Sequence, residues 1–428
     1  MEKYKKLSKS ELEELKLALN AEYAEAKSKG LKLDMSRGKP SPAQLDLAVD
    51  MLDVVNSKTV LKSESGIDCR NYGEFTGIPE IKKLMADIMS VDADNVIVYG
   101  NSSLNIMYDT ISRLMIEGKN GNTPWCKLDK VKFLCPVPGY DRHFLVTQHF
   151  GIEMIPVPLN EDGPDMDVVE KLVADDETIK GMWCVPKFSN PSGAVYSDDV
   201  VRRLASMKTA AKDFTIMYDN AYVIHYLYDD NQPVLLDIFA ECEKAGNPNR
   251  VYEFASTSKI SFAGAGIAAM ASSSENIAEV KKSLTIQTIG HDKINQLRHV
   301  LYYKDLDGVM KHMAKHAAIL RPKFEAVEEV FEKELGDLDI CTWTKPLGGY
   351  FISFNSLPGC AKAIVAMCKE AGVVLTGAGA TYPYGNDPQD SNIRIAPSFP
   401  TPEEMTEAAK LFALCVKLVS IDKLLEEK

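Results

Sequence analysis

Apolar and polar positions alternate along the middle of the chain in a way that predicts a sheet covered by helices. Short runs that are apolar on both faces are separated by polar or mixed segments of helix length, and these runs occupy residues 131–137, 151–157, 179–185, 214–220 and 250–256. Strands that are buried on both faces are typical of parallel sheets, because crossover helices cover both sides of such a sheet. We therefore expect an α/β fold with a mainly parallel sheet.

The same pattern predicts helices on either side of this region. Residues 9–29 repeat apolar side chains at helical spacing, with Ser10 as the expected N-cap and Gly30 as the expected stop. Further helical patterns cover residues 79–90, 104–117 and 306–335. The segment 344–355 is typical of a strand that follows a glycine turn.

The length of the chain indicates two domains. A chain of 428 residues exceeds what one ordinary core organises, and its apolar content of 45% suffices to fill two. We expect residues 61–320 to form a large domain around the sheet. Residues 1–60 and 321–428 are then the N-terminal and C-terminal parts of a smaller α/β domain.

Charge and cysteine content exclude several kinds of partner. The formal net charge of −12 would repel nucleic acid and anionic lipid, and no basic patch offsets it. The nine cysteines never form a CxxC pair, so we expect neither a disulfide framework nor a metal site. A charged N-terminus without an apolar core, and the absence of a long apolar run, predict a cytoplasmic protein without a membrane segment.

Lys259 is the first candidate for chemistry. It directly follows Ser256-Thr257-Ser258 at the end of the predicted strand over 250–256. A lysine among small hydroxyl residues at the end of a buried strand can have a lowered pKa and can condense with an aldehyde. The alternative is a solvated loop lysine.

Two further motifs follow predicted strands. Asp219, in the sequence DNAY, lies where an open α/β sheet binds ligands, and such a carboxylate can keep a pyridine nitrogen protonated. A helix cap is the alternative for this aspartate. Asn190 opens the sequence NPSG, which by itself indicates only a turn, yet both Asn190 and Tyr222 could donate to a phenolate oxygen.

The remaining candidates are an anion cradle, an aromatic cover and an arginine. The small residues at 100–103 precede a predicted helix whose free amides can face a phosphate. Tyr140 follows another strand and can cover one face of an aromatic ring, or simply pack. Arg394 is a lone cation in an apolar strand, and its partner is a substrate carboxylate or a salt bridge within the protein.

Taken in order, NPSG, DNAY, STSK and an arginine near the C-terminus resemble the fold-type-I pyridoxal-phosphate (PLP) enzymes of the class I and II aminotransferases. The resemblance covers nearly the whole chain. The stretches 35–47, 70–89, 98–109 and 287–299 look like the bacterial type Ic aspartate aminotransferases, whose domain is also called MocR-like. The winged-helix segment of the MocR regulators is missing, which indicates an enzyme.

The resemblance implies a fold, a cofactor and a set of roles. The fold is a large domain with a mainly parallel seven-stranded sheet between helices, and a smaller domain made from both termini. PLP forms a Schiff base with Lys259, which also moves the proton, while Asp219 pairs with the pyridine nitrogen. The other implied cofactor contacts are Asn190 and Tyr222 at the phenolate, Tyr140 on the ring, and Ser102, Ser103, Ser256 and Ser258 at the phosphate.

The resemblance also implies substrate contacts and a homodimer. Arg394 holds the α-carboxylate of the substrate, with Asn190 beside it, and Tyr72 reaches the phosphate of the neighbouring subunit. The sequence departs from the family pattern after Lys259, because ISFAGAGIA lacks the usual phosphate-binding arginine. We expect hydroxyls, helix amides and a partner group from residues 285–295 to replace it.

The distal carboxylate of the substrate has no clearly matching residue in the chain. Arg37 in the loop SRGKP is the first candidate, followed by Lys187 and Arg142. The expected reaction is amino transfer from aspartate to 2-oxoglutarate. An aminotransferase of different substrate, a C–S or β-lyase, and a decarboxylase are alternatives within the same fold.

Two more distant alternatives remain from the sequence. Residues 264–269 match the GxGxxA fingerprint of dinucleotide enzymes, although no strand leads directly into the first glycine. The second distant alternative is a regulatory protein that binds PLP without turnover.

Overall fold

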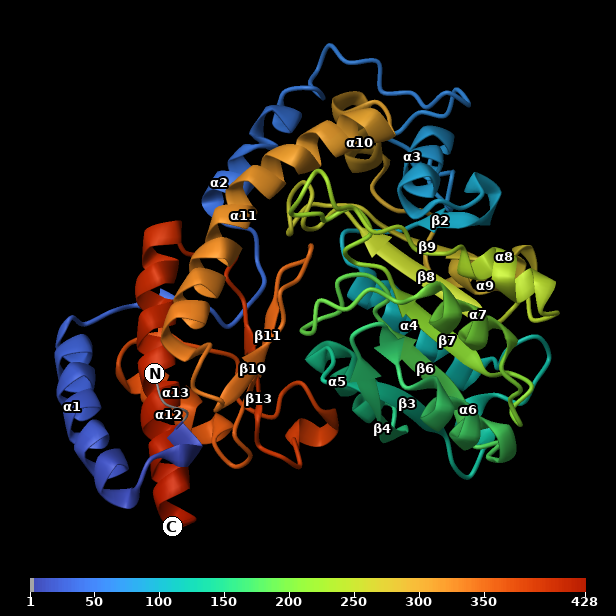
Figure 1. The fold of residues 1–428 in the computed structure, drawn as a ribbon. Coiled ribbons are helices and arrows are strands. Elements are labelled where there is room, and N and C mark those ends of the chain that lie inside the picture. Colours follow the sequence, from blue (N-terminus) through green and yellow to red (C-terminus); the bar gives the residue numbers. More distant parts are fainter. Residues whose placement is uncertain (1–3) are drawn as a thin grey trace.

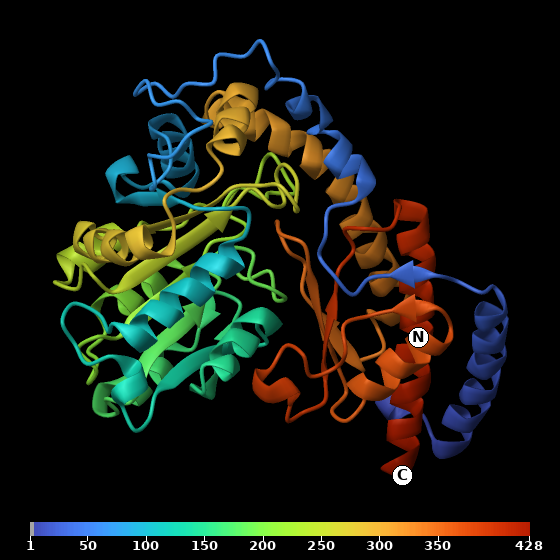
Figure 2. The same ribbon diagram turned by 180° about the vertical axis from the view of Figure 1, so that it is seen from behind.

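The computed structural model describes residues 4–428, which form two packed regions joined by the long helix α11 (Leu306–Leu335). One region contains the large sheet, and the other contains the first and last helices of the chain (Figure 1). The view from behind shows the same separation, with α11 crossing from one region to the other (Figure 2).

The large sheet has eight strands in the order β2-β9-β8-β7-β6-β3-β4-β5. Their bounds are β2 (Val96–Val98), β3 (Lys132–Val137), β4 (Glu153–Asn160), β5 (Gly163–Pro164), β6 (Ile179–Cys184), β7 (Thr215–Asp219), β8 (Val251–Ser256) and β9 (Ala268–Ser272). All neighbours from β8 to β4 are parallel, whereas β9 runs antiparallel to both of its neighbours. The eighth strand, β5, adds only two residues to the expected seven-stranded sheet.

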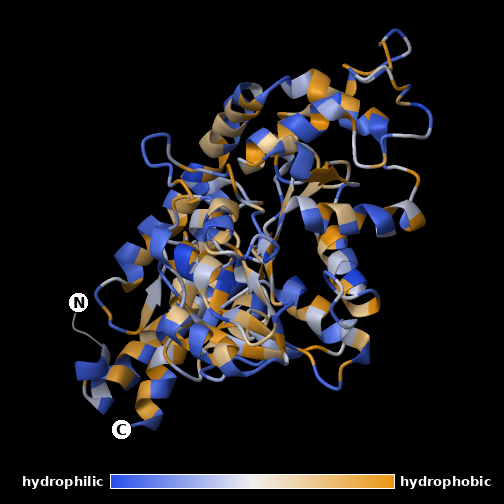
Figure 3. Cartoon of the chain, turned by 90° about the vertical axis from the view of Figure 1, so that its right-hand side faces the viewer, coloured by the Kyte–Doolittle hydropathy of each residue, from blue (hydrophilic) through white to orange (hydrophobic). Residues whose placement is uncertain are grey.

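Helices cover both faces of this sheet, as apolar strands require. They are α3 (Pro79–Met89), α4 (Ser103–Ile116), α5 (Asp141–His149), α6 (Met166–Asp175), α7 (Asp198–Ser206), α8 (Ile238–Lys244), α9 (Ser274–Gln287) and α10 (Lys293–Tyr303). One core lies between the sheet and helices α4, α5 and α9, and another lies between the sheet and helices α6, α7 and α8. The ribbons of many helices alternate between hydrophilic and hydrophobic colours, as amphipathic helices do (Figure 3).

The second region combines both ends of the chain. It contains α1 (Lys9–Ser28), α12 (Ala361–Glu370) and α13 (Pro402–Glu426), the antiparallel strands β10 (Cys341–Trp343), β11 (Ile352–Ser356) and β13 (Asn392–Ile395), and the parallel pair β1 (Leu33–Asp34) and β12 (Val373–Val374). The short helix α2 (Pro42–Asp46) contacts α11. Short 3-10 helices occupy Tyr4–Lys6, Val49–Leu52, Ala93–Asn95, Trp125–Lys127 and Pro383–Gly385. One apolar cluster runs through α1, α11, α12 and α13, so the N-terminal and C-terminal segments share a core.

The predicted elements are confirmed, with one correction at a helix end. The strand predictions match β3, β4, β6, β7 and β8, and the helix predictions match α1, α3, α4 and α11. Ser10 is not the cap of α1. Ser8 caps it instead, because Ser8 and Glu11 form a reciprocal capping box that places Ser10 inside the helix. The predicted domain boundaries stay predictions. Within residues 4–428, no helix is both long and apolar enough to cross a bilayer.

The shared core of the two chain ends predicts a strong effect of one substitution. Phe412 on α13 is fully buried, and its ring centroid lies 4.8 Å from that of Phe354 and 5.4 Å from that of Phe331. Truncation at such a site leaves a cavity, so we expect Phe412→Ala to reduce the free energy of unfolding by about 3–5 kcal/mol. Urea unfolding followed by tryptophan fluorescence measures this. Leu17→Ala, at a position that is 73% exposed, should change stability by less than about 0.5 kcal/mol.

Candidate active site

A cavity of about 660 Å³ lies at the carboxyl edge of the sheet and is closed by residues from the second region. It brings together nearly all of the predicted site residues: Arg37, Ser102, Ser103, Tyr140, Asn190, Asp219, Tyr222, Ser256, Ser258, Lys259 and Arg394. Parallel strands end at the same edge, which explains why motifs that are far apart in sequence meet here. Asp219 ends β7, Ser256 ends β8, and Asn190 follows β6.

The carboxylate of Asp219 is fixed by a histidine that the sequence analysis did not single out. His143 on α5 lies with its Nε2 atom 2.8 Å from Oδ2 of Asp219, and both side chains are buried. The histidine ring stacks on Trp183 with centroids 4.1 Å apart. Trp183 donates to Thr147, which donates to the carbonyl of His143. The other Asp219 oxygen, Oδ1, is buried and has no partner within the described protein.

His143 could have been found from the sequence. It lies in the first turn of α5, three residues after Tyr140, which is the N-cap of that helix. The rings of Tyr140 and His143 meet edge to face at 4.9 Å. What the sequence did not show is that β7 places Asp219 within hydrogen-bond distance of His143.

Lys259 is partly buried and lines the cavity. Its Nζ atom lies 5.1 Å from the ring centroid of Tyr222 and 5.8 Å from that of Tyr350. Burial lowers the pKa of Lys259, and the negative charge of Asp219 opposes that shift. Burial also raises the pKa of Tyr222 well above its usual value, so the phenol keeps its proton. The pair provides a nucleophilic amine beside a hydrogen-bond donor.

Arg394 on β13 brings a cation from the second region into the cavity. Its Nη1 atom forms an ion pair of 2.7 Å with Asp141 and lies 3.4 Å from Oδ1 of Asn190. Thr376 accepts weaker bonds from the same guanidinium, and the ring of Phe351 stacks 5.0 Å away. The internal salt bridge considered for Arg394 is therefore present, and it lies at the cavity wall where a second carboxylate can also approach.

Hydroxyl groups and a helix end line the opposite part of the cavity. Ser102 is the N-cap of α4, yet its side chain makes no capping hydrogen bond, so the first-turn amides of α4 lack that internal partner. The hydroxyls of Ser256 and Ser258 lie 2.8 Å apart. Helix amides and hydroxyls together are suited to bind a phosphate.

The segment after Lys259 contains no arginine before β9. The glycine-rich stretch runs into β9, and Thr257 holds its end by accepting from the amide of Ile267. Arg298 on α10 donates to the carbonyl of Ala265 in this stretch. Its side chain does not line the cavity. The GxGxxA match also fails here, because a strand and not a helix follows it.

The remaining four candidates, Tyr72, Arg37, Arg142 and Lys187, differ in where they lie. Tyr72 is 76% exposed and does not line the cavity of its own chain, so its role toward a second subunit stays a prediction. Arg37 and Arg142 both line the cavity, in keeping with their candidacy for a distal carboxylate. Lys187 does not line this cavity. It follows β6, and its side chain is buried on the other side of the sheet, where Nζ lies 2.8 Å from the carbonyl oxygen of Val223.

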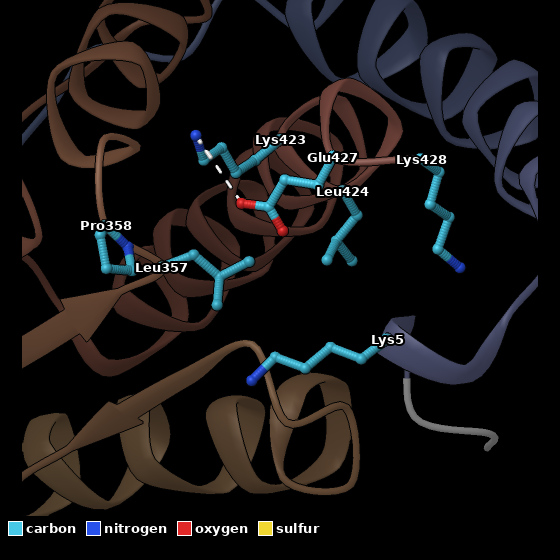
Figure 4. A pocket seen from close by; sticks show the side chains of 7 residues that line it. All are labelled: Lys5, Leu357, Pro358, Lys423, Leu424, Glu427 and Lys428. Atoms are coloured by element: carbon cyan, nitrogen blue, oxygen red, sulfur yellow. Dashed lines mark ion pairs between the residues drawn. The ribbon is translucent and has the colours of Figure 1, made fainter.

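Another hollow lies where the two ends of the chain meet. Lys5, Leu357 and residues at the end of α13 line it, and the ion pair of Lys423 with Glu427 spans 3.8 Å (Figure 4). It contains none of the predicted site residues. Among residues 4–428, no group of three or more His, Cys, Asp or Glu side chains is placed to hold a metal ion.

The sheet order and the converging lysine, aspartate and arginine define the class of protein: this is the fold of the fold-type-I PLP-dependent enzymes. The α-aminoadipate aminotransferase LysN from Thermus thermophilus, solved with N-(5′-phosphopyridoxyl)-L-leucine, shares this fold. Its TM-score is 0.73 at 18% sequence identity, and the alignment covers 95% of this chain and 96% of that chain.

The chain belongs to the aspartate aminotransferase family, since residues 7–428 match the family described as aspartate amino-transferase. An aspartate aminotransferase from Corynebacterium glutamicum is 48% identical over 405 residues, which cover 94% of this chain and 93% of that one. The crystal structure of an aspartate transaminase from the same species has a TM-score of 0.96, with 46% identity and 99% of both chains covered. The protein is an aminotransferase.

The lowered pKa of Lys259 can be measured directly. In protein stripped of carbonyl compounds with hydroxylamine, cyanate should carbamylate Lys259 with a pH–rate midpoint below that of the exposed Lys333, because only the neutral amine reacts. Mass spectrometry of peptides sampled between pH 6 and 11 gives both midpoints. A midpoint for Lys259 at or above that of Lys333 would contradict the buried, desolvated environment.

Proposed function

We propose that this aminotransferase uses PLP bound at Lys259 and transfers the amino group of aspartate to 2-oxoglutarate. The observation that carries the proposal is the convergence of Lys259, Asp219 and Arg394 on one cavity, with Asn190 and Tyr222 between them. Each group meets a separate requirement of the reaction: an amine for the cofactor, a carboxylate for its ring and a cation for the substrate. The relatives named for aspartate support the choice of substrate.

The residues present fit PLP. A buried carboxylate oxygen without a partner is costly, and a protonated ring nitrogen at Asp219 Oδ1 would satisfy it. The uncapped end of α4 and the Ser256–Ser258 pair suit the phosphate, and Tyr140 suits the ring. When bound, PLP supplies an aldehyde that condenses with amines and a protonated ring that withdraws electrons from the substrate Cα.

The side chains around the cofactor have separate roles in proton transfer. Lys259 Nζ, whose pKa is lowered by burial, would take the proton from the substrate Cα and return it to the carbon that carried the aldehyde. Asp219 holds the proton of the ring nitrogen, and His143 keeps the carboxylate in position. Tyr222 and Asn190 donate to the phenolate oxygen.

Arg394 orients the substrate by binding its α-carboxylate. The ion pair with Asp141 keeps the guanidinium in place before substrate arrives, and an incoming carboxylate competes with Asp141 for the same cation. Arg37, Lys39 and Arg142 are the remaining cations of the cavity wall. Lys39 lies 3.9 Å from Asp34 and over the ring of Phe399, so Arg37 and Arg142 are the candidates for the distal carboxylate. Arg37 is our first choice.

The proposed assembly is a cytoplasmic homodimer with shared active sites, in which Tyr72 and residues 285–295 reach the phosphate of the partner. Exposed apolar side chains at Tyr72, Ile286 and Ile289 support a covering partner at this surface. All nine cysteines are free thiols, which fits a reducing compartment.

The reaction is tested by a half-reaction. We expect aspartate to shift the absorbance of the purified holoenzyme from the Schiff-base form to the pyridoxamine form and to release one oxaloacetate per site. 2-Oxoglutarate should then restore the original spectrum. Release of pyruvate, ammonia or carbon dioxide without a stable shift would favour a lyase or decarboxylase. No spectral change with any of the twenty amino acids would refute the aminotransferase assignment to this site.

Substitution of the cavity arginines separates the two carboxylate contacts. Arg394→Lys should lower kcat/KM about 100-fold for both aspartate and alanine, because a lysine cannot replace the bidentate fork at the α-carboxylate. Arg37→Gln should lower kcat/KM for aspartate while leaving alanine nearly unchanged. Arg142→Gln tests the second candidate in the same assay, and Arg202→Gln on the exposed face of α7 serves as control. Equal losses for both substrates in Arg37→Gln would exclude a distal-carboxylate role.

A further inference from the structure

A second cavity, of about 320 Å³, lies on the other side of β7 from the catalytic cavity. Successive residues of a strand point to opposite faces, so Asp219 faces the catalytic cavity while Tyr218 and Asn220 line the second one. Tyr218 is paired in register with Glu253 of β8, which lines the same space. The volume is at the lower end of the range for small-molecule sites, about 300–1,000 Å³.

Lys187 is a buried cation at this cavity. Its Nζ atom donates to the carbonyl of Val223 at 2.8 Å and to the hydroxyl of Tyr226 at 2.6 Å. Neither partner is charged, and the structure shows no ion pair between Lys187 and any carboxylate of residues 4–428. Burial alone lowers the pKa of this lysine to about 8. Two of the three N–H groups of the Lys187 ammonium are used in these hydrogen bonds, so the third can donate to a bound anion.

Polar atoms without partners surround the same space. The hydroxyl of Tyr218 and Oδ1 of Asn220 are buried, and neither has a hydrogen-bond partner in the described protein. Glu253 accepts from Nδ2 of Asn220 at 2.7 Å. Burial raises the pKa of Glu253 to about 8, so at neutral pH this carboxyl keeps its proton and acts as a donor. Buried polar atoms of this kind are normally satisfied by water or a ligand.

Asp87, Ser90 and Asp237, all exposed, lie at the rim of the cavity. Its remaining walls are apolar. They come from the end of α3, the start of α11 and the loop before α8, and they include Ile88, Met89, Val91, Leu235, Leu306 and Met310. A single cation among apolar walls can neutralise one negative charge and not two. This composition favours a ligand with one carboxylate and an aliphatic chain over a phosphate or a dicarboxylate.

We propose that the cavity lined by Lys187, Tyr218 and Glu253 is a second ligand site that binds a small aliphatic monocarboxylic acid. The carboxylate lies at the Lys187 ammonium, with Tyr218 and the Glu253 carboxyl as further donors, and the chain packs on the apolar walls. The site does not include Lys259 or Arg394. Binding is therefore independent of the proposed reaction, and each can fail without the other.

Calorimetric titration of the holoenzyme with 4-methylpentanoate tests the site, and the neutral 4-methylpentanamide is the matched control ligand. Since a carboxylate can also bind at Arg394, the titration is made in Arg394→Gln protein, whose retained cofactor absorbance shows that the catalytic cavity is intact. We expect one acid bound per chain and weaker binding of the amide. Lys187→Met should weaken the acid about tenfold or more.

A second variant addresses the case in which Lys187→Met does not fold. Leu235→Trp fills the cavity from its partly exposed rim and should abolish binding, whereas Leu301→Trp, on the exposed side of α10, should not. Affinity should also fall between pH 7 and 9. Lys187 loses its positive charge and Glu253 gains a negative one over this range, and both changes oppose a bound carboxylate. Glu253→Gln should make that fall shallower.

Three results would overturn the proposal. They are no acid binding in Arg394→Gln protein at millimolar concentration, equal affinity for the acid and the amide, and unchanged affinity in both Lys187→Met and Leu235→Trp. Any of them would mean that this cavity does not bind a carboxylate at Lys187. The absorbance response of the wild-type protein to aspartate, measured in parallel, reports separately on the proposed reaction.

Discussion

The buried carboxylate of Asp219 is the constraint on which the site depends. A carboxylate that is removed from water is destabilising by several kcal/mol unless charges and hydrogen bonds compensate it. His143 supplies one contact, Lys259 interacts electrostatically with the carboxylate, and one oxygen is left without a partner. The surrounding packing serves this arrangement. His143 can hold its position because it stacks on Trp183, and Trp183 is tied to the same helix through Thr147. The carboxylate of Asp219 is thus held in place, while its Oδ1 atom still lacks a hydrogen bond. A ligand that donates a hydrogen bond to this atom would satisfy it.

The contribution of the second region is equally specific. Arg394 belongs to β13, far from the large sheet in sequence, and it contacts Asp141 and Asn190 at the edge of that sheet. The cavity exists only where the two regions meet, so the parts that bind a substrate carboxylate and the parts that bind a cofactor come from different cores. Because α11 is shared by both regions, a movement of one against the other would change the distance from Arg394 to Lys259 more than any distance within either region.

Strand β7 connects the two cavities of the large region. Its alternating side chains place Asp219 on one side and Tyr218 and Asn220 on the other, each beside a lysine whose pKa is lowered by burial. Two parallel strands, β7 and β8, therefore present polar residues to both faces of an otherwise apolar sheet. Such residues are destabilising in a fold unless they meet a partner, and Glu253 and Asn220 partly satisfy each other.

The sequence by itself determined the elements and the membership of the site. Local patterns suffice for these, because apolar periodicity defines strands and helices and because parallel strands bring their carboxyl ends to one edge. Local rules placed Lys259, Asp219 and Asn190 at strand ends, the resemblance to the aminotransferases grouped them with Tyr222 as one site, and the structure places all four in one cavity. Only the tertiary structure decided which partners complete them. His143 beside Asp219, Asp141 on Arg394 and the removal of Lys187 to a separate cavity depend on contacts between residues separated by 36 or more positions. No local pattern encodes such contacts, since they follow from how whole elements pack.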